Sequence, residues 1–271
     1  MDAISSILLR FSVTARVFFS GRLCTTEDFD ATEGVGYLHV LRQGNLLVSN
    51  TTGGEQIVDQ PSFLFYSRPF SHRFYPIQES GVELVCASVD LGTANPLFTA
   101  LPGFQRMPLA EVPEIQPALD LLFLEAFVQR SGRQAALDRL IEYILILLIR
   151  HLIDSKTFRE GLLAGLADSR LARALTAMHE RQSEAWSLER LAEEAGMSRA
   201  RFAHHFKKTV GQTPLSYLTD YRIGLAKNLL KQRQPVMTVA HSVGYQSPAA
   251  FARTFQRKCG IAPSEWLKSR S

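Results

Sequence analysis

One motif occurs twice near the end of this chain. Residues 191–218 read LAEEAGMSRARFAHHFKKTVGQTPLSYL, and residues 239–267 read VAHSVGYQSPAAFARTFQRKCGIAPSEWL. The offset between the copies is 48 residues before the turn and 49 after it, and the aligned pairs are Ala192/Ala240, Gly196/Gly244, Phe202/Phe251, Phe206/Phe255, Gly211/Gly260 and Pro214/Pro263. A helix, a glycine turn and a second helix with aromatic anchors form a helix-turn-helix pattern. Two tandem copies predict a helical domain whose first expected partner is nucleic acid.

The two halves of the chain carry opposite net charge. Residues 1–154 hold 11 Lys and Arg against 17 Asp and Glu, a net of −6, whereas residues 155–271 hold 19 against 9, a net of +10. A basic segment that also carries the repeat favours contact with a polyanion, because phosphate neutralisation needs clustered Lys and Arg. A merely solvated basic surface is the alternative that charge by itself leaves open.

The first copy predicts two helices over about 187–210 with a sharp turn between them. Ser187 is expected to cap the first helix and Ser198 the second, and Gly196 lies where the chain must turn with positive φ. Phe202 and Phe206, four residues apart, share the inner face of the second helix. The outer face of that helix then carries small and basic side chains: Arg199, Ala200, Ala203, His204, Lys207 and Lys208.

The second copy, over about 236–259, follows the same plan. Gly244 turns the chain, and Ser247 caps a helix that has Pro248 at its first position, where the missing N–H costs nothing. Phe251 and Phe255 anchor that helix, and its outer face carries Ala249, Ala250, Arg253, Gln256 and Arg257. Aromatic anchors behind and small or basic residues in front suit a recognition helix in the DNA major groove.

A helix is expected between the two copies, from Pro214 to Lys231. A rod of about 18 residues would span about 27 Å at 1.5 Å per residue. Two units separated by that length could place both second helices in successive major grooves, about 34 Å apart, on one face of the duplex. A plain helical bundle with glycine-containing turns is the structural alternative, and this spacing favours the DNA-binding interpretation.

Residues 12–90 read as short strands separated by Gly, Pro, Asn and Ser. Runs rich in Val, Phe, Tyr and Leu lie at Val17–Phe19, Tyr37–Leu41, Leu46–Val48, Phe63–Tyr66 and Glu83–Val89. Between two of these runs, Asn50–Gly54 is a hairpin-turn signal. Together these features predict a β-sandwich or a small barrel.

From about residue 114 the periodicity becomes helical. Two helices are expected, separated by Gly132, and the second continues to about Ile153. That second helix is apolar almost all round, so it must be buried. It could pack inside the chain and, in addition, against the same helix of a second copy in a homodimer. Residues 155–169, with Gly161 and Gly165, are expected to be a linker.

The cysteines and the apolar segments indicate the cellular compartment in which the protein is expected. Cys24, Cys86 and Cys259 contain no closely spaced pair, which argues against a disulfide framework or a Cys-rich zinc site. Asp2 stands where a signal peptide would be basic. The apolar run Tyr143–Ile149 is far shorter than the roughly 20 residues that span a bilayer. A reducing cytoplasm is the expected compartment, without a membrane partner.

These motifs resemble a known family. Residues 170–271, most clearly VAHSVGYQSPAAFARTFQRKCGIAPSEW, look like the DNA-binding domain of AraC/XylS bacterial transcriptional regulators. The N-terminal half resembles the cupin-type sensor domain of one branch, in GYLHVLRQGNLLV and PSFLFYSRPFSHRF. The resemblance implies a two-domain α+β protein. A cupin-like β-barrel with two helices after it would occupy 1–154, followed by a linker and, over 170–271, an all-α domain of two helix-turn-helix units joined by a long helix.

The resemblance further implies a regulator that is not an enzyme and needs no cofactor. Its partners would be double-stranded promoter DNA, RNA polymerase and a small-molecule or oxidant effector at the N-terminal domain, with a homodimer as an open alternative. Carried over position by position, the base-reading residues would be Arg199, Ala200, Ala203, His204, Ser247, Ala249, Ala250 and Arg253. The residues nearer the DNA backbone would be Lys207, Lys208, Gln256 and Arg257.

The first recognition helix departs from the family pattern at two positions. Ala200 and Ala203 stand where many relatives have large polar or aromatic residues. Alanine can touch a thymine methyl group but cannot donate a hydrogen bond. Readout by this copy is therefore expected to depend on Arg199, Arg201 and His204, with Arg201 as a solvated flank in the alternative interpretation.

His39 and His72 are the candidates for a metal site in the cupin-like domain. The position two residues after His39, where a second ligand is expected, is Leu41, and two imidazoles do not complete a zinc or iron site. We therefore expect structural roles for both histidines. This disfavours the alternative function, a cupin metalloenzyme fused to a DNA-binding domain.

Cys24 and Cys86 also leave two interpretations open. They could be small buried hydrophobes, as most free cysteines are. The resemblance suggests instead an oxidant-sensing pair that becomes linked or oxidised and changes DNA affinity. A third class of protein, an architectural DNA-binding protein without regulation, would leave the β-rich half without a role.

Overall fold

The computed structural model describes residues 2–11, 13–50 and 54–268 of the chain, which divides into two compact units. The β unit comprises Val13–Thr93 and Leu101–Leu152. The helical unit comprises Met1–Ser12, Ala94–Ala100 and Ile153–Ser271. The division near residue 153 is close to the expected end of the first domain, but two segments of the N-terminal half join the helical unit.

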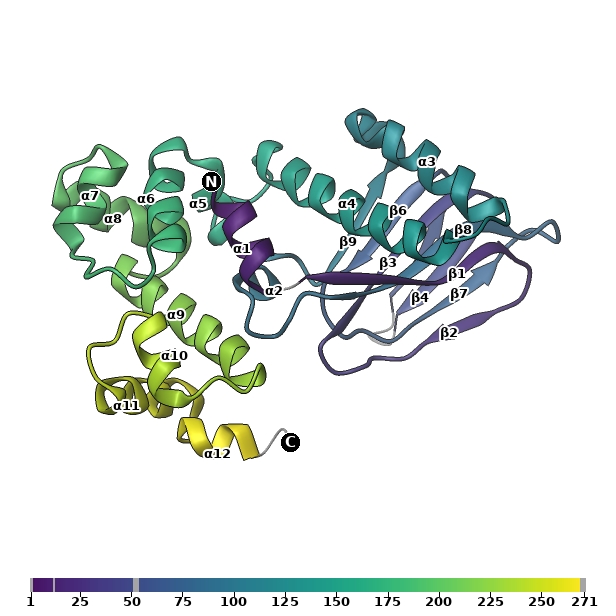
Figure 1. The fold of residues 1–271 in the computed structure, drawn as a ribbon. Coiled ribbons are helices and arrows are strands. Elements are labelled where there is room, and N and C mark those ends of the chain that lie inside the picture. Colours follow the sequence, from purple (N-terminus) through teal and green to yellow (C-terminus); the bar gives the residue numbers. More distant parts are fainter. Residues whose placement is uncertain (1, 12, 51–53, 269–271) are drawn as a thin grey trace. The chain divides into compact units, whose positions relative to one another are not determined.

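Two antiparallel sheets make up the β unit (Figure 1). The five-stranded sheet has the order β1 (Thr14–Leu23), β8 (Val82–Asp90), β3 (Val35–Gln43), β6 (Ser62–Tyr66) and β9 (Phe104–Pro108). The four-stranded sheet has the order β2 (Glu27–Phe29), β7 (His72–Pro76), β4 (Leu46–Asn50) and β5 (Glu55–Val58). All five strand runs expected from the sequence lie within strands, whereas β2, β5, β7 and β9 are additional. Residues 51–53 of the expected hairpin turn lie outside the described residues.

An apolar core lies between the inner faces of the two sheets. Leu41, Leu64 and Leu84 from the five-stranded sheet are buried in one cluster with Val48 and Phe74 from the four-stranded sheet. Each such fully buried side chain stabilises the fold by roughly 1.5–3 kcal/mol relative to exposure. The two sheets therefore enclose one apolar core, as expected of a β-sandwich or a small barrel.

Two helices complete the β unit, after the short η1 (Leu109–Glu111) and η2 (Pro113–Ile115). α3 (Gln116–Phe127) and α4 (Arg133–Asp154) are separated by Gly132 at φ +79°, as expected. α4 covers the open edge of β1, because Val17 N–H donates to Asp138 Oδ1 at 2.7 Å and Gln134 Nε2 donates to Val17 O at 2.8 Å. Across the described residues, no helix combines the length and apolarity that crossing a membrane requires.

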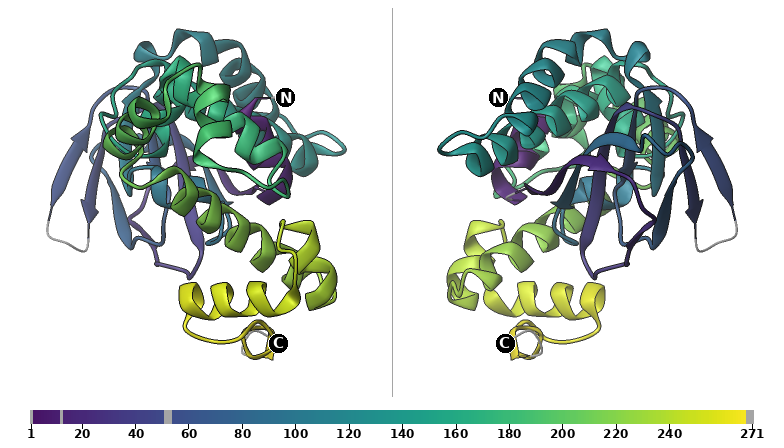
Figure 2. Two further views of the ribbon diagram at one scale, coloured as in Figure 1. Left: turned by 90° about the vertical axis from the view of Figure 1, so that its left-hand side faces the viewer. Right: turned by 90° about the vertical axis from the view of Figure 1, so that its right-hand side faces the viewer.

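The helical unit contains the remaining helices (Figures 1 and 2). They are α1 (Ala3–Phe11), α2 (Pro96–Ala100), α5 (Leu162–Ala167), α6 (Ser169–Glu180), α7 (Leu188–Ala195), α8 (Arg199–Val210), α9 (Pro214–Lys231), α10 (Val236–Ser242), α11 (Pro248–Cys259) and α12 (Pro263–Lys268). The long α9 lies between the α7–α8 pair and the α10–α11 pair, with the bounds expected from the sequence. Both expected helix-turn-helix units are therefore present.

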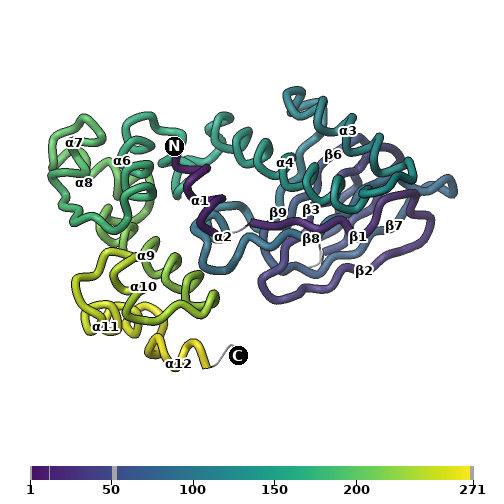
Figure 3. The backbone as a smooth tube through the Cα atoms, viewed as in Figure 1, coloured from purple at the N-terminus to yellow at the C-terminus, as the bar shows by residue number. Residues whose placement is uncertain are grey.

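The N-terminal helix α1 packs beside α6 in the helical unit (Figure 3). Ile7 and Phe11 on its apolar face are buried, and Asn228 of α9 donates to Arg10 O at 2.6 Å. The prediction of a single domain over 1–154 therefore differs from the structure at this helix. An amphipathic nine-residue helix is stabilised by whichever apolar surface it covers, and its own sequence does not identify that surface.

The expected linker also differs from the structure. Within 155–169, α5 forms a helix whose Leu162 and Leu163 are buried, and Gly161 N–H donates to Thr209 O at 2.8 Å. This segment packs against the first helix-turn-helix unit, so the linker prediction is wrong for residues 162–167. Gly165 permits close packing, since a Cβ there would lie 2.8 Å from the Val210 side chain, whereas Gly161 adopts a positive φ of +95° before α5.

Candidate nucleic-acid interface

The first helix-turn-helix unit is held by local signals that the sequence makes visible. Ser187 Oγ accepts the backbone N–H of Arg190 at 3.2 Å and caps α7. Gly196 ends α7 in the left-handed region at φ +62°, where a side chain would be strained. Phe202 and Phe206 of α8 are fully buried and meet edge to face at 5.6 Å. Loss of either ring would cost about 3–5 kcal/mol.

The expected cap of α8 is wrong. Within the described chain, Ser198 has the extended backbone of a cap residue but makes no side-chain hydrogen bond to the helix. The first turn of α8 is instead held through the Ser198 carbonyl, which accepts the N–H of Phe202 at 2.8 Å.

The second unit repeats the arrangement and keeps its cap. Ser247 Oγ accepts the N–H of Ala250 at 3.2 Å, Pro248 occupies the first turn of α11, and Gly244 turns the chain at φ +86°. Phe251 and Phe255 are fully buried, and Phe255 also packs edge to face on Trp266 of α12. Ser247 accepts one bond within the helix, which leaves its hydroxyl hydrogen and one lone pair of the oxygen for other partners.

The predicted DNA-contacting side chains lie on the outer surfaces of α8 and α11. On α8, Ala203 is partly buried and the others are exposed: Arg199, Ala200, Arg201, His204, Lys207 and Lys208. On α11, Ser247 and Ala250 are partly buried and the others are exposed: Ala249, Arg253, Gln256 and Arg257. Each helix thus presents small residues and cations on the side away from its phenylalanine anchors, as a major-groove helix requires.

One of these cations is already paired. Arg199 Nε lies 2.7 Å from Glu189 Oε1, which belongs to the first turn of α7. A hydrogen bond with its own backbone, another with Ser187 and the charge of Arg199 lower the pKa of the Glu189 carboxyl. Glu189 therefore stays ionised beside Arg199, and this ion pair was not predicted from the sequence.

A hollow beside α8 was also not predicted. Its volume is about 430 Å³, and the recognition helix contributes Ala200, Ala203, His204 and Lys207 to its lining. The opposite wall comes from Leu188 and from Thr213, Pro214 and Leu215 at the start of α9. The two alanines leave this space open, and the leucines make it apolar. The repeat revealed the alanines, but their spatial neighbours come from other helices.

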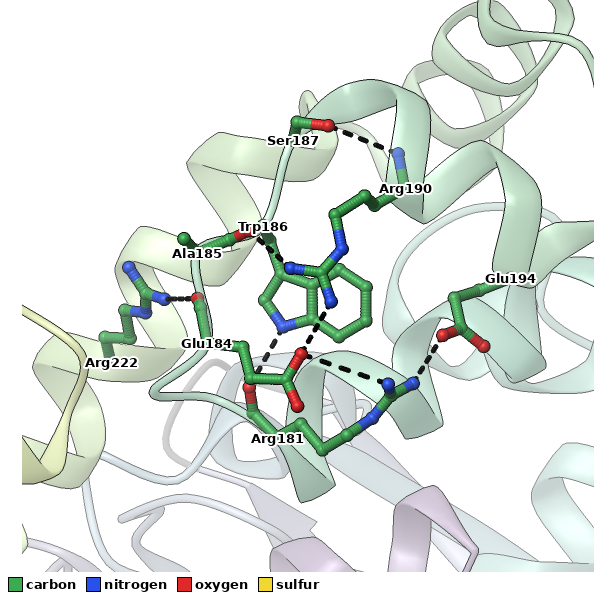
Figure 4. A network of polar contacts seen from close by, with 8 residues as sticks. All are labelled: Arg181, Glu184, Ala185, Trp186, Ser187, Arg190, Glu194 and Arg222. Carbon is green, nitrogen blue, oxygen red and sulfur yellow. Dashed lines mark hydrogen bonds and ion pairs between the residues drawn. The ribbon is translucent and has the colours of Figure 1, made fainter.

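The loop between α6 and α7 is stiffened by one aromatic ring and its charged neighbours (Figure 4). The guanidinium carbons of Arg181 and Arg190 each lie 4.8 Å from the Trp186 ring centroid. Trp186 Nε1 donates to Arg181 O at 3.0 Å, and Arg190 also donates to Ala185 O and to the Glu184 carboxylate, each at 2.7 Å. This network positions Ser187, and with it the start of α7.

His39 and His72 form a buried pair inside the β unit. Their Nε2 atoms are 2.9 Å apart, and His72 Nδ1 donates to Phe70 O at 3.0 Å. His72 Nε2 therefore accepts, and His39 Nε2 donates. Burial lowers the pKa of His72 to about 4, and burial with His72 nearby lowers the pKa of His39 well below its ordinary value. Among the described residues, no three His, Cys, Asp or Glu side chains group as metal ligands.

The two cysteines of the β unit have different environments. Cys24 is exposed, whereas Cys86 is buried, and burial raises the pKa of its thiol well above the ordinary value. Leu23 pairs with Val82 and Phe19 with Cys86, so Cys24 and Cys86 lie five positions apart along neighbouring strands. Five residues correspond to roughly 17 Å of strand, too far for a disulfide, which needs Cα atoms within about 7 Å. Direct linkage of this pair is therefore excluded in this conformation.

A small apolar cavity lies beside Cys86. Its volume is about 170 Å³, and its lining combines Cys86 with one carboxylate and five apolar side chains: Glu27, Phe18, Phe19, Leu23, Phe29 and Leu84. Phe18 is half exposed. A cavity of about 150 Å³ with apolar walls accommodates a molecule the size of benzene. The cavity therefore admits a small apolar molecule next to the buried thiol.

Two protein-family models match the chain. The one described as Helix-turn-helix domain matches residues 191–269, and the one described as Cupin matches residues 2–154. The first match begins within α7 and covers the rest of the first helix-turn-helix unit and all of the second. The second covers the β unit together with α1.

Relatives align over much of the chain. An uncharacterised HTH-type transcriptional regulator of Haemophilus influenzae is 36% identical over 176 residues, which cover 65% of this chain and 59% of that protein. The RCS-specific HTH-type transcriptional activator RclR of Escherichia coli is 28% identical over 280 residues, which cover 98% of this chain and 97% of that protein. The chain thus spans about three fifths of the first relative and nearly all of the second.

A solved DNA-binding domain is also similar to part of the chain. The DNA-binding domain of AdpA, in complex with a target DNA, is 31% identical with a TM-score of 0.36. The match covers 38% of this chain and 93% of that domain.

Proposed function

Because this chain belongs to the AraC/XylS family, with a cupin domain ahead of two helix-turn-helix units, we propose that it is a transcriptional regulator that binds specific promoter sequences. The observation that carries the proposal is the matched presentation of α8 and α11. Each stands on two buried phenylalanines and turns small and basic side chains outward. The 18-residue α9 that joins the two units is about 27 Å long, a length comparable to the roughly 34 Å repeat of the DNA major groove.

The proposed contacts fall into two groups. Bases are read by the outer residues nearest the start of each recognition helix: Arg199, Ala200, Arg201, Ala203, His204, Ser247, Ala249, Ala250 and Arg253. Phosphates are neutralised by residues further along each helix: Lys207, Lys208, Gln256 and Arg257. Phosphate contacts supply affinity for any sequence, and base contacts supply the preference for one promoter.

Footprinting of the DNA upstream of the neighbouring genes, followed by binding titrations at several salt concentrations, tests this function. We expect protection of two adjacent major grooves on one face of the duplex. If the protein makes six or more phosphate contacts, raising the salt concentration from 50 to 200 mM should weaken binding by roughly a thousandfold. A flat salt response would contradict DNA binding altogether. Equal protection of random sequences would instead favour the architectural alternative.

We propose further that the β unit acts as a sensor and has no catalytic activity. The His39–His72 pair supports this proposal, because the two Nε2 atoms bond to each other and no third His, Cys, Asp or Glu among the described residues joins them as a metal ligand. Metal analysis of the purified full-length protein is the deciding measurement. Stoichiometric iron or zinc, together with turnover of an added substrate, would favour the metalloenzyme alternative.

The signal that the sensor receives is a small molecule or an oxidant. The 170 Å³ cavity beside Cys86 supports a small apolar ligand, and the exposed thiol of Cys24 supports oxidation. One relative, RclR, is named as RCS-specific. Promoter binding with and without hypochlorite, in Cys24→Ser, Cys86→Ser and the control Cys259→Ser, tests the oxidant. If all three variants respond like the unchanged protein, the cysteines are not the sensor.

We propose further that the protein acts in the cytoplasm, that it contacts RNA polymerase at the promoter, and that it forms a homodimer. The apolar face of α4 is buried, including Ile141 and Leu148, so we expect a dimer to use other surface. α3 exposes Leu121 and Leu124 by more than half. Sedimentation of the full-length protein beside Leu124→Glu tests this, since a dimer that uses α3 should dissociate in the variant. An unchanged dimer would place the interface elsewhere.

A further inference from the structure

Arg222 lies in the middle of α9 and is tied to the loop that precedes the first helix-turn-helix unit (Figure 4). Its Nε donates to Gln182 O and its Nη2 donates to Glu184 O, each at 2.7 Å. A guanidinium can donate hydrogen bonds to two carbonyl oxygens at once, because its N–H donors are held in a rigid plane. Arg222 therefore fixes the rotation of α9 relative to the α6–α7 loop.

The same side chain also touches the second unit. The guanidinium carbon of Arg222 lies 5.9 Å from the ring centroid of Tyr245, which follows the turn glycine of that unit. Tyr245 packs edge to face on Phe251, one of the two anchors of α11. Through this contact Arg222 is connected to the recognition helix of the second unit.

The turn of the second unit also contacts the α6–α7 loop directly. A Cβ at Gly244 would lie 2.7 Å from Ser183 Cα, 2.8 Å from Ser183 O and 2.9 Å from Arg222 Nη2. Backbone approaches of this kind exclude every residue except glycine. The glycine is thus required twice, for the turn at φ +86° and for docking on the loop.

The loop that receives both contacts is itself stiff. Arg181 and Arg190 enclose Trp186, and the Glu184 carboxylate bonds to Arg190. The next residue, Ser187, caps α7. A continuous set of contacts therefore runs from the second unit through Arg222 to the start of the first, in addition to the covalent path along α9.

From these contacts we infer that Arg222 is a positioning residue that locks the two helix-turn-helix units into one orientation and thereby sets the half-site spacing that the protein accepts. The inference rests on the proposed function. One inserted base pair moves a half-site by about 3.4 Å and rotates it by about 35°. A rigid pair of units cannot follow such a change, whereas a pair joined by α9 alone can adjust.

Binding to spacing variants of the footprinted site tests the inference. The probes carry the native spacing, one deleted base pair, or one or two inserted base pairs between the half-sites. For the unchanged protein we expect a loss of roughly 10- to 100-fold per shifted base pair, comparable to one or two mismatched pairs. In Arg222→Met the loss on the shifted probes should fall to about threefold, a fraction of the cost of one mismatch. Arg222→Lys, which keeps the charge but not the planar donors, should lie between.

Arg173→Met is the matched control. Arg173 Nη2 donates to Ala195 O at 2.8 Å, so it makes the same kind of bond but within the first unit alone. This variant should keep the spacing profile of the unchanged protein, even where overall affinity falls. If Arg222→Met loses affinity equally on all probes and keeps the same steep dependence of affinity on half-site spacing, Arg222 has only a structural role and the inference is wrong.

A measurement without DNA separates this inference from the proposed function. Spin labels at Lys208→Cys and Gln256→Cys, in a chain with Cys24→Ser and Cys259→Ser, report the distance between α8 and α11. We expect a narrow distribution that broadens in Arg222→Met and stays narrow in Arg173→Met. Equal widths in all three proteins would overturn the inference, even if the promoter is bound. Failure to bind any promoter would overturn the proposed function without changing this result.

Discussion

Arg199 Nε lies 2.7 Å from Glu189 Oε1, so the first residue of one recognition helix is neutralised by the helix before it. Both side chains are more than half exposed, and solvent and salt screen an exposed ion pair strongly, so it contributes little to stability. A competing anion can therefore displace Glu189 at little cost. The pair lowers the positive charge that the outer face of α8 presents.

Replacing Glu189 with Gln should tighten binding to any DNA by up to about fivefold at low salt, because the electrostatic effect of one solvent-exposed charge is modest. The gain should shrink as salt screens the remaining charges. Fluorescence anisotropy with a random duplex measures it. Glu33→Gln makes the same change of net charge in the β unit and should have no such effect. Equal gains in both variants would indicate net charge alone.

Thymine should be preferred where the hollow beside α8 meets the major groove. Ala200 and Ala203 can contact a thymine methyl group, and burying one methyl contributes roughly 0.8 kcal/mol. Replacing a single thymine of the first half-site with deoxyuridine should therefore weaken binding about fourfold. In Ala203→Ser that difference should shrink. If no thymine of the half-site is sensitive to its methyl group, the hollow does not read bases.

Arg253→Ala should weaken binding to the specific site by about 1–3 kcal/mol and leave binding to random DNA nearly unchanged, as expected of a base contact. Arg253 is exposed on the outer face of α11. Lys208→Ala is the comparison, since a phosphate contact should lose affinity for both kinds of DNA and reduce the salt dependence. Equal losses in Arg253→Ala on both duplexes would make Arg253 a phosphate contact.

Acid should destabilise the β unit through the buried histidine pair. The pKa of His72 is about 4 in the folded chain, against about 6.5 in an unfolded one, so only the unfolded state takes up a proton between these values. Stability should be full above about pH 6.5 and decline by roughly 3 kcal/mol as the pH falls to about 4. His39, whose pKa is also lowered, adds to the loss.

Pulse proteolysis in urea, read on fragments of residues 13–152, measures this stability at several pH values. His72→Gln should flatten the pH dependence, because its side chain does not titrate. His204→Gln, in the exposed face of α8, should leave the dependence as it was. A β unit that is more stable at pH 5 than at pH 7.5 would show that the histidines are not the cause.

The repeat predicted the helical elements closely because the signals that begin and end a helix are local. α9 was expected over Pro214–Lys231 and has those bounds. The caps at Ser187 and Ser247 were confirmed, and so were the turns at Gly196 and Gly244. A cap joins residues three apart and a glycine turn needs one φ angle, so neighbouring residues suffice to specify them.

Predictions failed where an element depended on partners far along the chain. The short edge strands β2 and β5 contain too few residues to show a period, and their pairing with β7 and β4 defines them. The cap at Ser198 is an exception, because it was a local prediction and was still wrong: its side chain makes no hydrogen bond to the helix. The linker prediction was wrong at α5, because buried leucines outweighed the flexibility that two glycines suggested.

The sequence by itself determined that this chain has a β-rich half and two helix-turn-helix units, and which side chains those units turn outward. The tertiary structure decided the rest. It packed α1 against α6 and brought the Nε2 atoms of His39 and His72 to 2.9 Å from each other. It also placed Arg222 in hydrogen-bond contact with the backbone of Gln182 and Glu184, about 40 residues earlier in the chain. The physical reason is the range of the interactions. Periodicity and caps act between neighbours, whereas these contacts form only after separate elements have packed together.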